Sequence, residues 1–238
     1  MKLFEIGFNY SRLFLSPLYL FVYKTVKQLV KLKDANVSLL DVGGRKSHHT
    51  INIPAEITVT DIPRESNIQT DLHLGTNEDI INQLYSRRSN IKEYLIDNMV
   101  DTKLPKESFD IIMAIEVLEH VKEDKLFIKN VYETLKPGGI FFMTTPNGDH
   151  VINTNPDHVR HYTKKQLLSV LNSSFNKIDI NYTIFEGKFY FYSLNSWSIR
   201  QPLKTVCAML SSLINNYQSK KVLYPYNSRH LSAIAIKK

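Results

Sequence analysis

Two acids and two glycines in the first third of the chain have the residue types and spacing of a nucleotide-binding site. A run of apolar residues ends on Asp41, Gly43 and Gly44. This is typical of a buried strand that breaks into a tight turn, where the backbone can approach a ligand closely. Asp61 follows Asp41 by 20 residues, and a carboxylate at that distance can accept hydrogen bonds from both hydroxyls of a ribose. These four residues alone do not identify a site, because glycine turns and acids at strand ends also occur for structural reasons.

A parallel sheet is needed to bring these residues together, and the hydrophobic pattern beyond residue 36 predicts one. Apolar runs alternate with segments of helical periodicity, which indicates an α/β fold with a doubly wound, mostly parallel sheet covered on both faces. Only about one helical turn fits between Gly44 and Ile57, because Pro54 interrupts the crossover. Helices are expected at Glu78–Arg87, Asp124–Leu135 and Lys164–Leu171. The seven expected strands are Val37–Val42, Ile57–Thr60, Ile91–Ile96, Phe109–Ala114, Ile140–Thr144, Ile178–Phe185 and Leu231–Ile236.

Two segments do not belong to this alternation. Residues 1–36 are expected to form an N-terminal helical appendage to a domain over residues 37–238. The apolar segment Leu13–Val30 contains Pro17, Lys24 and Lys27 and is too interrupted for a membrane-spanning helix, and no signal-peptide cleavage site follows it. We expect an amphipathic helix that packs on the domain as a lid over the cofactor cleft. A helix on a membrane surface is the alternative.

The second segment is a helical insertion at about residues 186–229, with a helix over roughly Pro202–Tyr217. Six apolar residues recur along that helix at helical spacing, which favours a face packed into the core. The six are Leu203, Val206, Leu210, Leu213, Ile214 and Tyr217.

Composition limits the class of protein. The 238 residues are 43% hydrophobic and 22% charged, which is ordinary for one globular domain with a sizeable core. The net charge of +7 suits nucleic acid, an anionic membrane surface or an acidic small molecule, and does not choose among them. Cys207 is the only cysteine, so an internal disulfide and a cysteine-built metal site are excluded, and a cytoplasmic location is expected.

Motifs in the middle of the chain resemble those of the class I S-adenosylmethionine-dependent methyltransferases. They are LPKESFDIIMAIEVLEHV, from Leu104 to Val121, and LKPGGIFFMTTPNGDH, from Leu135 to His150. The family has an LP turn, a strand that begins SFD, a VLEHV segment and LKPGG before the next strand, in the same order. The resemblance extends from about Val37 to Phe175. It implies a Rossmann-like methyltransferase fold whose last strand, Leu231–Ile236, is antiparallel.

The resemblance implies S-adenosyl-L-methionine as the cofactor and gives roles to particular residues. Asp61 is expected to bind the ribose hydroxyls, and Ile62 to pack near the adenine. Asp97 is the better placed acid for the adenine amino group, with Asn98 and Met99 in the same pocket, while Asp101 and Asp71 are rivals. The loop from Ala114 to Glu116 is expected to flank the transferred methyl group.

The first loop departs from the family pattern, because Arg45 and Ser47 stand where further glycines are usual. We interpret Asp41 as orienting the loop or the ammonium end of the cofactor, and Gly43 and Gly44 as giving backbone approach. Arg45 offers a cation for the carboxylate of the cofactor, in place of a helix N-terminus. The alternative is that Arg45 points into solvent.

Methyl transfer needs a base only if the acceptor must lose a proton, and histidine is the natural base for a hydroxyl. His158 is the candidate that could reach the acceptor, with His161 close by in the same segment. His120 is the other candidate, and its expected role is to fix the VLEHV loop. His48 and His49 have neither the spacing nor the nearby carboxylates of a metal site, and no metal is expected.

The acceptor is not specified by the sequence. Lysines and arginines are dispersed, so nucleic acid is disfavoured, and a small molecule is expected, including an anionic or lipid- or sugar-linked one with peripheral membrane contact. Two alternatives to a methyltransferase remain. A catalytically silent cofactor-binding partner subunit would explain the altered glycine loop. An NAD-dependent Rossmann oxidoreductase would explain the glycine turn and Asp61, but not VLEHV or LKPGG.

Overall fold

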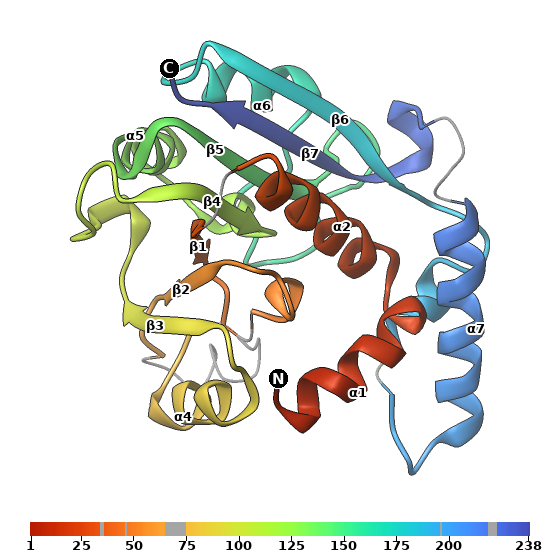
Figure 1. Cartoon of the computed structure of the whole chain (residues 1–238). Helices are drawn as coiled ribbons and strands as arrows, with labels where there is room; N and C mark the ends of the chain where they lie inside the picture. The colour runs from red at the N-terminus through yellow and green to blue at the C-terminus, as the bar shows by residue number, and fades with distance from the viewer. Residues whose placement is uncertain (34–35, 46, 65–74, 196, 219–222) are drawn as a thin grey trace.

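The computed structural model describes residues 1–33, 36–45, 47–64, 75–195, 197–218 and 223–238. Within these ranges the strands form one seven-stranded sheet in the order β3-β2-β1-β4-β5-β7-β6 (Figure 1). The parallel strands are β1 (Ser38–Val42), β2 (Glu56–Asp61), β3 (Ile91–Ile96), β4 (Phe109–Ile115) and β5 (Leu135–Pro146). Next to β5, β7 (Ser228–Ile236) is antiparallel both to it and to the edge strand β6 (Lys177–Phe185). The predicted fold class and the antiparallel last strand are confirmed.

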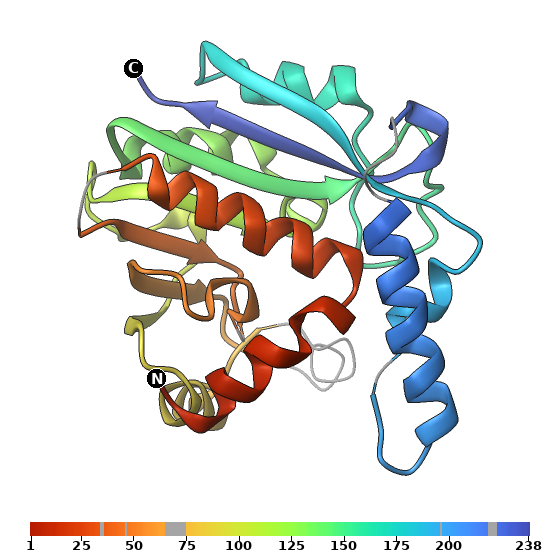
Figure 2. The ribbon, with the colours of Figure 1, turned by 45° about the vertical axis from the view of Figure 1, so that its right-hand side comes forward.

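Successive residues of each strand point to opposite faces of the sheet, and each face has its own core. Leu39, Ile57 and Phe142 face one side, where α2 (Pro17–Lys31) and α4 (Glu78–Arg87) cover them. Leu40 and Phe141 face the other side, under α5 (Asp124–Thr134) and α6 (Lys164–Leu171). Figure 2 shows α2 running along the first face.

The N-terminal segment consists of α1 (Leu3–Ser11), a 3₁₀ turn η1 (Arg12–Phe14) and α2. Pro17 occupies the start of α2, where its missing N–H costs no helical hydrogen bond. Val22 and Val26 are fully buried against the sheet. Contrary to the expected lid over the cofactor cleft, α2 is part of the core, because its buried valines pack on the strands. Leu18, near its start, lines a cavity at the edge of the sheet. Among the described residues, no helix combines the length and apolarity needed to cross a membrane.

The crossover after β1 is short, as predicted. Only a 3₁₀ turn, η2 (His48–Thr50), lies between β1 and β2 within the described residues. Ser47 precedes it in the left-handed conformation, with φ of 45°. The chain therefore reaches β2 without the full helix that would normally follow a glycine loop.

The helix of the insertion, α7 (Pro202–Gln218), is turned the opposite way from the prediction. Its buried residues are small or polar: Ala208, Ser211, Ser212 and Asn215. The predicted core stripe faces outward instead, with Leu203 82% and Tyr217 75% exposed. Periodicity finds an apolar face, but which face is covered depends on the neighbouring elements, and here these are the two 3₁₀ turns η1 and η5 (Phe191–Leu194).

Candidate active site

A cavity of about 390 Å³ lies at the carboxyl ends of β1, β2, β3 and β4. This is the edge of a parallel sheet where ligands bind in doubly wound folds. The loops after these four strands meet there and bring most of the predicted residues together. Nine of them line the cavity: Gly43, Arg45, Asp61, Ile62, Asp97, Asn98, Met99, Glu116 and His120.

Four predicted residues do not line this cavity. Ala114 is fully buried inside β4, between Val42 of β1 and Met143 of β5, so no ligand in the cavity can touch it. Asp41, buried at the end of β1, and Gly44 of the following loop are not part of the lining, and His158 lines a neighbouring cavity. A Cβ on Gly44 would lie 2.4 Å from the carboxyl carbon of Asp41. Gly44 is therefore required for the packing of Asp41, whereas Gly43 lines the cavity itself.

Asp61 and Asp97 are the two aspartates that line the cavity. The backbone N–H of Ile62 donates to Oδ1 of Asp61 over 2.8 Å. Burial raises the pKa of Asp61 to about 6, against the opposing charges of Arg45 and Arg64. The amide of Asp97 donates to the carbonyl of Asp61 over 3.1 Å, which fixes the two strand ends side by side.

Asp97, which was predicted for an adenine amino group, lines the cavity. Its Oδ2 accepts from the amide of Lys103 over 2.9 Å, while its buried Oδ1 has no hydrogen-bond partner among the residues that the structure describes. Asp101 pairs with the ammonium group of Lys103, is 81% exposed and lies outside the cavity lining. Asp71 lies outside the described residues.

The side chains present fit S-adenosylmethionine. An unpartnered carboxylate oxygen at Asp97 suits the adenine amino group, and Asp61 suits the two ribose hydroxyls. Ile62, Met99 and Val117 give the cavity apolar walls of the kind that an adenine ring needs. Gly43 has φ of 67°, and a Cβ there would come within 2.7 Å of Val117. Arg45 is half-buried, lines the cavity and interacts with the charge of Asp61, so its side chain is not directed simply into solvent.

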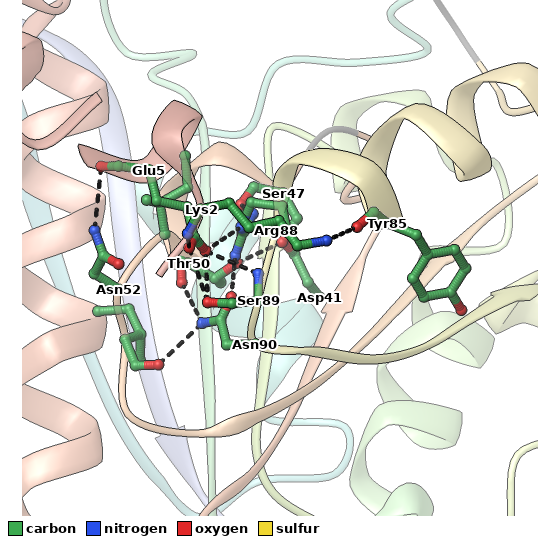
Figure 3. Close-up of polar contacts among 12 residues, drawn as sticks. Lys2, Glu5, Asp41, Ser47, Thr50, Asn52, Tyr85, Arg88, Ser89 and Asn90 are labelled. Atoms are coloured by element: carbon green, nitrogen blue, oxygen red, sulfur yellow. Dashed lines mark hydrogen bonds and ion pairs between the residues drawn. The ribbon is translucent and has the colours of Figure 1, made fainter. Parts of the chain in front are cut away.

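The loop after β1, which is followed by a 3₁₀ turn rather than a full helix, is fixed by a buried polar network (Figure 3). The hydroxyl of Ser47 donates to Oδ2 of Asp41 over 2.6 Å. Arg88, at the end of α4, donates to the carbonyl of Ser47 and, over 2.9 Å, to the hydroxyl of Thr50. Burial raises the pKa of Asp41 to about 6, although the Ser47 hydrogen bond and the charge of Arg88 act in the opposite direction.

The network continues into the N-terminal helix. Glu5 of α1 is fully buried, 3.8 Å from Nε of Arg88, and accepts from the amide of Ser89 over 3.0 Å. Burial alone would raise the pKa of Glu5, but hydrogen bonds from Lys2 and Ser89 and the charge of Arg88 lower it overall. Sequence reasoning missed Arg88 and Glu5, which are 83 residues apart and belong to no local motif.

A second cavity, of about 650 Å³, adjoins the first. Glu116 lines both. Thr144 donates to Oε1 of Glu116 over 2.8 Å, and Nδ1 of His230 lies 3.1 Å from Oε2. Burial raises the pKa of Glu116, but His230 and Thr144 lower it overall, which keeps the carboxylate ionised. Glu116 has φ of 55°, a costly conformation for a non-glycine residue and one that is concentrated at functional sites.

Histidines form the wall of the second cavity next to Glu116. Nδ1 of His161 faces the carbonyl of Val151 at 2.9 Å and therefore donates to it. In the neutral pair, Nε2 of His161 then accepts from Nδ1 of His158 over 2.8 Å, which leaves a lone pair on Nε2 of His158. Burial and the neighbouring imidazoles of His120 and His161 lower the pKa of His158, so this base is neutral at neutral pH.

Comparison with known proteins identifies the family. A family model described as a methyltransferase domain matches residues 15–197. The chain belongs to the class I S-adenosylmethionine-dependent methyltransferases. The predicted family and its cofactor are confirmed, and the dehydrogenase alternative is removed.

Relatives of this methyltransferase match it over part of their length. A probable S-adenosylmethionine-dependent methyltransferase of Mycolicibacterium smegmatis is 26% identical over 38% of this chain and 37% of its own. A ubiquinone biosynthesis O-methyltransferase of Rickettsia akari is 23% identical over 48% of this chain and 51% of its own. The chain thus spans about half or less of these curated relatives. The structure of a SAM-dependent methyltransferase from Archaeoglobus fulgidus shares the fold, with a TM-score of 0.59, 15% identity and coverage of 92% of this chain and 94% of that one.

Proposed function

We propose that this methyltransferase transfers the methyl group of S-adenosylmethionine to a hydroxyl oxygen of a small, lipid-linked acceptor. The proposal rests on the position of Glu116, which lines both cavities. The neutral imidazole of His158 lies beside it in the second cavity. The first cavity suits the cofactor. The second then holds the acceptor, and the two ligands meet at Glu116.

The neutral histidine favours an oxygen acceptor. S-adenosylmethionine supplies an electrophilic methyl group on a sulfonium that leaves as a neutral thioether. The acceptor hydroxyl gives its proton to Nε2 of His158 as its oxygen bonds to the methyl carbon, and the electrons of the broken carbon–sulfur bond stay on sulfur. His161 orients the imidazole, and Glu116 stabilises the positive charge that His158 gains. A relative named a ubiquinone biosynthesis O-methyltransferase supports oxygen as the acceptor atom.

Binding of S-adenosylhomocysteine, the demethylated cofactor, tests the cofactor half of the proposal. We expect Asp61→Ala to weaken binding by about 1.5–3 kcal/mol, because one charged hydrogen-bond acceptor is lost. This corresponds to about 10- to 150-fold in the dissociation constant measured by calorimetry. The matched control is Asp101→Ala, which removes an exposed acid outside the cavity and should leave the affinity unchanged. Equal affinity of Asp61→Ala and the unaltered chain would contradict the ribose assignment.

Methyl transfer itself is tested with radiolabelled S-adenosylmethionine and acceptors that have a phenolic or sugar hydroxyl, with and without a lipid chain. Transfer that requires both the hydroxyl and the chain supports the proposal. Binding of S-adenosylhomocysteine without transfer to any of these acceptors would favour the silent partner subunit.

A lipid-linked acceptor is supported by the apolar surface at the mouth of the second cavity. Ile152 and Leu194 line that cavity and are 82% and 51% exposed. The exposed face of α7 continues this surface, since α7 packs against η5, which contains Leu194. Exposed basic residues, Lys188, Arg200 and Lys204, are close by in the chain and suit an anionic membrane surface. An apolar surface of this kind marks a contact site.

Vesicle binding checks this surface. The double variant Leu203→Glu, Leu210→Glu places charges on the outward face of α7 and should lower co-sedimentation with phosphatidylglycerol vesicles at least about tenfold, because burial of each leucine contributes on the order of 1.5–3 kcal/mol. Leu168→Glu on α6 is the matched control, since Leu168 is 40% exposed on a helix distant from α7 (Figure 1). If the double variant and the control sediment alike, α7 does not contact the membrane.

A further inference from the structure

Three side chains lie together at the junction of the two cavities. Glu119 and His120 belong to the 3₁₀ turn η4 (Leu118–His120), which follows β4, and His158 comes from the segment before α6. A carboxylate oxygen of Glu119 and one ring nitrogen from each histidine lie within 4.8 Å of one another. The rings of His120 and His158 are 4.6 Å apart and perpendicular, at 89°. His120 lines the first cavity and His158 the second.

Hydrogen bonds leave the outer nitrogen of both histidines available as a ligand. Nδ1 of His120 faces the carbonyl of Asp157 at 3.1 Å and donates to it. Nδ1 of His158 donates to His161, as described above. Each imidazole therefore presents an unprotonated Nε2, and its orientation is fixed by a backbone carbonyl or by a second histidine. Metal-binding histidines characteristically have such a partner on the other ring nitrogen.

The environment of Glu119 points to a bound ligand. The side chain is fully buried, and its Oε2 accepts from the hydroxyl of Thr145 over 3.1 Å. Its Oε1 is buried with no hydrogen-bond partner anywhere in the described parts of the chain. A buried carboxylate oxygen without a partner is costly, and here a second carboxylate, Glu116, acts on it electrostatically. A cation at this point would satisfy the oxygen and offset the negative charge of Glu116 beside it.

We infer that Glu119, His120 and His158 bind a divalent transition-metal cation at the junction of the two cavities. Two imidazoles and one carboxylate favour ions such as Zn²⁺, Co²⁺ or Mn²⁺ over Mg²⁺ or Ca²⁺, which prefer oxygen ligands. Three protein ligands leave a coordination position open, as in catalytic rather than structural sites. No metal site was predicted from the sequence, because the only histidines considered as metal ligands were His48 and His49.

The cation would have a function in methyl transfer, and this part of the inference rests on the proposed function. An acceptor hydroxyl entering the second cavity would reach the open coordination position. The cation would lower the pKa of that hydroxyl and hold its oxygen beside the first cavity. The proton would then leave to solvent, and His158 would act as a ligand rather than as the proton acceptor.

Cobalt binding tests the site independently of activity. The tag-free full chain is treated with a chelator, dialysed and titrated with Co²⁺, with visible absorption and calorimetry as readouts. We expect one equivalent to bind. Both Glu119→Gln and His158→Ala should weaken binding at least about 100-fold, since loss of a hydrogen-bonded partner of a ligand already costs 10–100-fold. His150→Ala is the control. His150 lines the second cavity but pairs with Glu186, and its removal should leave Co²⁺ affinity unchanged.

Affinity for S-adenosylhomocysteine, measured on the same samples, separates the two proposals and shows that each variant is folded. Weakened Co²⁺ binding in both ligand variants, with S-adenosylhomocysteine affinity retained, supports the metal site. Absence of Co²⁺ binding to the unaltered chain, or equal Co²⁺ binding by Glu119→Gln and His158→Ala, overturns the metal site and leaves the methyltransferase proposal intact. Normal Co²⁺ binding by a chain that does not bind S-adenosylhomocysteine supports the metal site and overturns the proposed function.

Discussion

Replacement of His158 by alanine is expected to lower kcat for methyl transfer about 10²- to 10³-fold, within the range for loss of a positioned acid–base group. The affinity for S-adenosylhomocysteine should not change, because His158 lines the second cavity and not the first. Steady-state kinetics with a hydroxyl acceptor, together with calorimetry, measure the two effects separately. A kcat within about threefold of the unaltered enzyme would exclude His158 from the reaction.

The pH profile gives a second readout of His158. Its pKa is lowered from 6.5 by burial and by the adjacent imidazoles, so the neutral form persists to a more acid pH than for a free histidine. A neutral imidazole is needed both as a proton acceptor and as a metal ligand. The acid limb of kcat/KM should therefore lie below 6.5. Replacement of His161, which orients His158, should lower kcat less, by about tenfold. An acid limb above 6.5 would contradict the assignment.

Much of the fold could be predicted because it depends on local signals. Buried parallel strands are short apolar runs, and turn residues mark their ends, so all seven strands were found in sequence, although β5 is longer than the predicted Ile140–Thr144. The residues that end those strands, such as Asp61 and Asp97, necessarily meet at one edge of a parallel sheet. Their presence in one cavity therefore follows from the order of the strands alone.

What the sequence could not give is the side of an element that faces the core. The apolar stripe of α7 was expected inside and is outside, since an insertion has no strand pattern to define its orientation. The reverse holds for α2, whose valines pack under the sheet where a lid was expected. A chain shortened by residues 1–30 would lose Val22 and Val26 from the core and would unfold rather than open the cleft.

Contacts between segments that are distant in the chain could not be predicted from the sequence either. His120 and His158 are 38 residues apart, and their closeness depends on how the segment before α6 folds back across η4. In the same way, Arg88 reaches the loop after β1 only because α4 ends beneath it. No spacing rule connects such pairs, and each becomes apparent only as a buried charge with specific partners.

Arg88→Ala is expected to lower the free energy of unfolding by about 3–5 kcal/mol, the range for removing one partner of a buried ion pair. Arg88 is 3% exposed, and its loss would leave Glu5 and Asp41 buried without their nearest cation. Urea unfolding at neutral pH measures the effect. Arg87→Ala is the matched control: the adjacent arginine is exposed and lies over the ring of Phe4, so its removal should cost less than about 1 kcal/mol.

Because the network supports the loop after β1, the same substitution should also weaken cofactor binding. Arg88 fixes the carbonyl of Ser47, and Ser47 fixes Asp41, under the loop whose Gly43 and Arg45 line the first cavity.

If Arg88→Ala does not fold, Glu5→Gln provides a milder test. It keeps the shape of the side chain but removes the charge that faces Arg88, and it should cost about 1.5–3 kcal/mol of stability. Both variants should lose affinity for S-adenosylhomocysteine in proportion to their loss of stability, whereas a chain destabilised elsewhere in the core should not. Equal stability of Arg88→Ala and Arg87→Ala would show that the loop keeps its conformation without the network, and that the short crossover needs no support from α1 and α4.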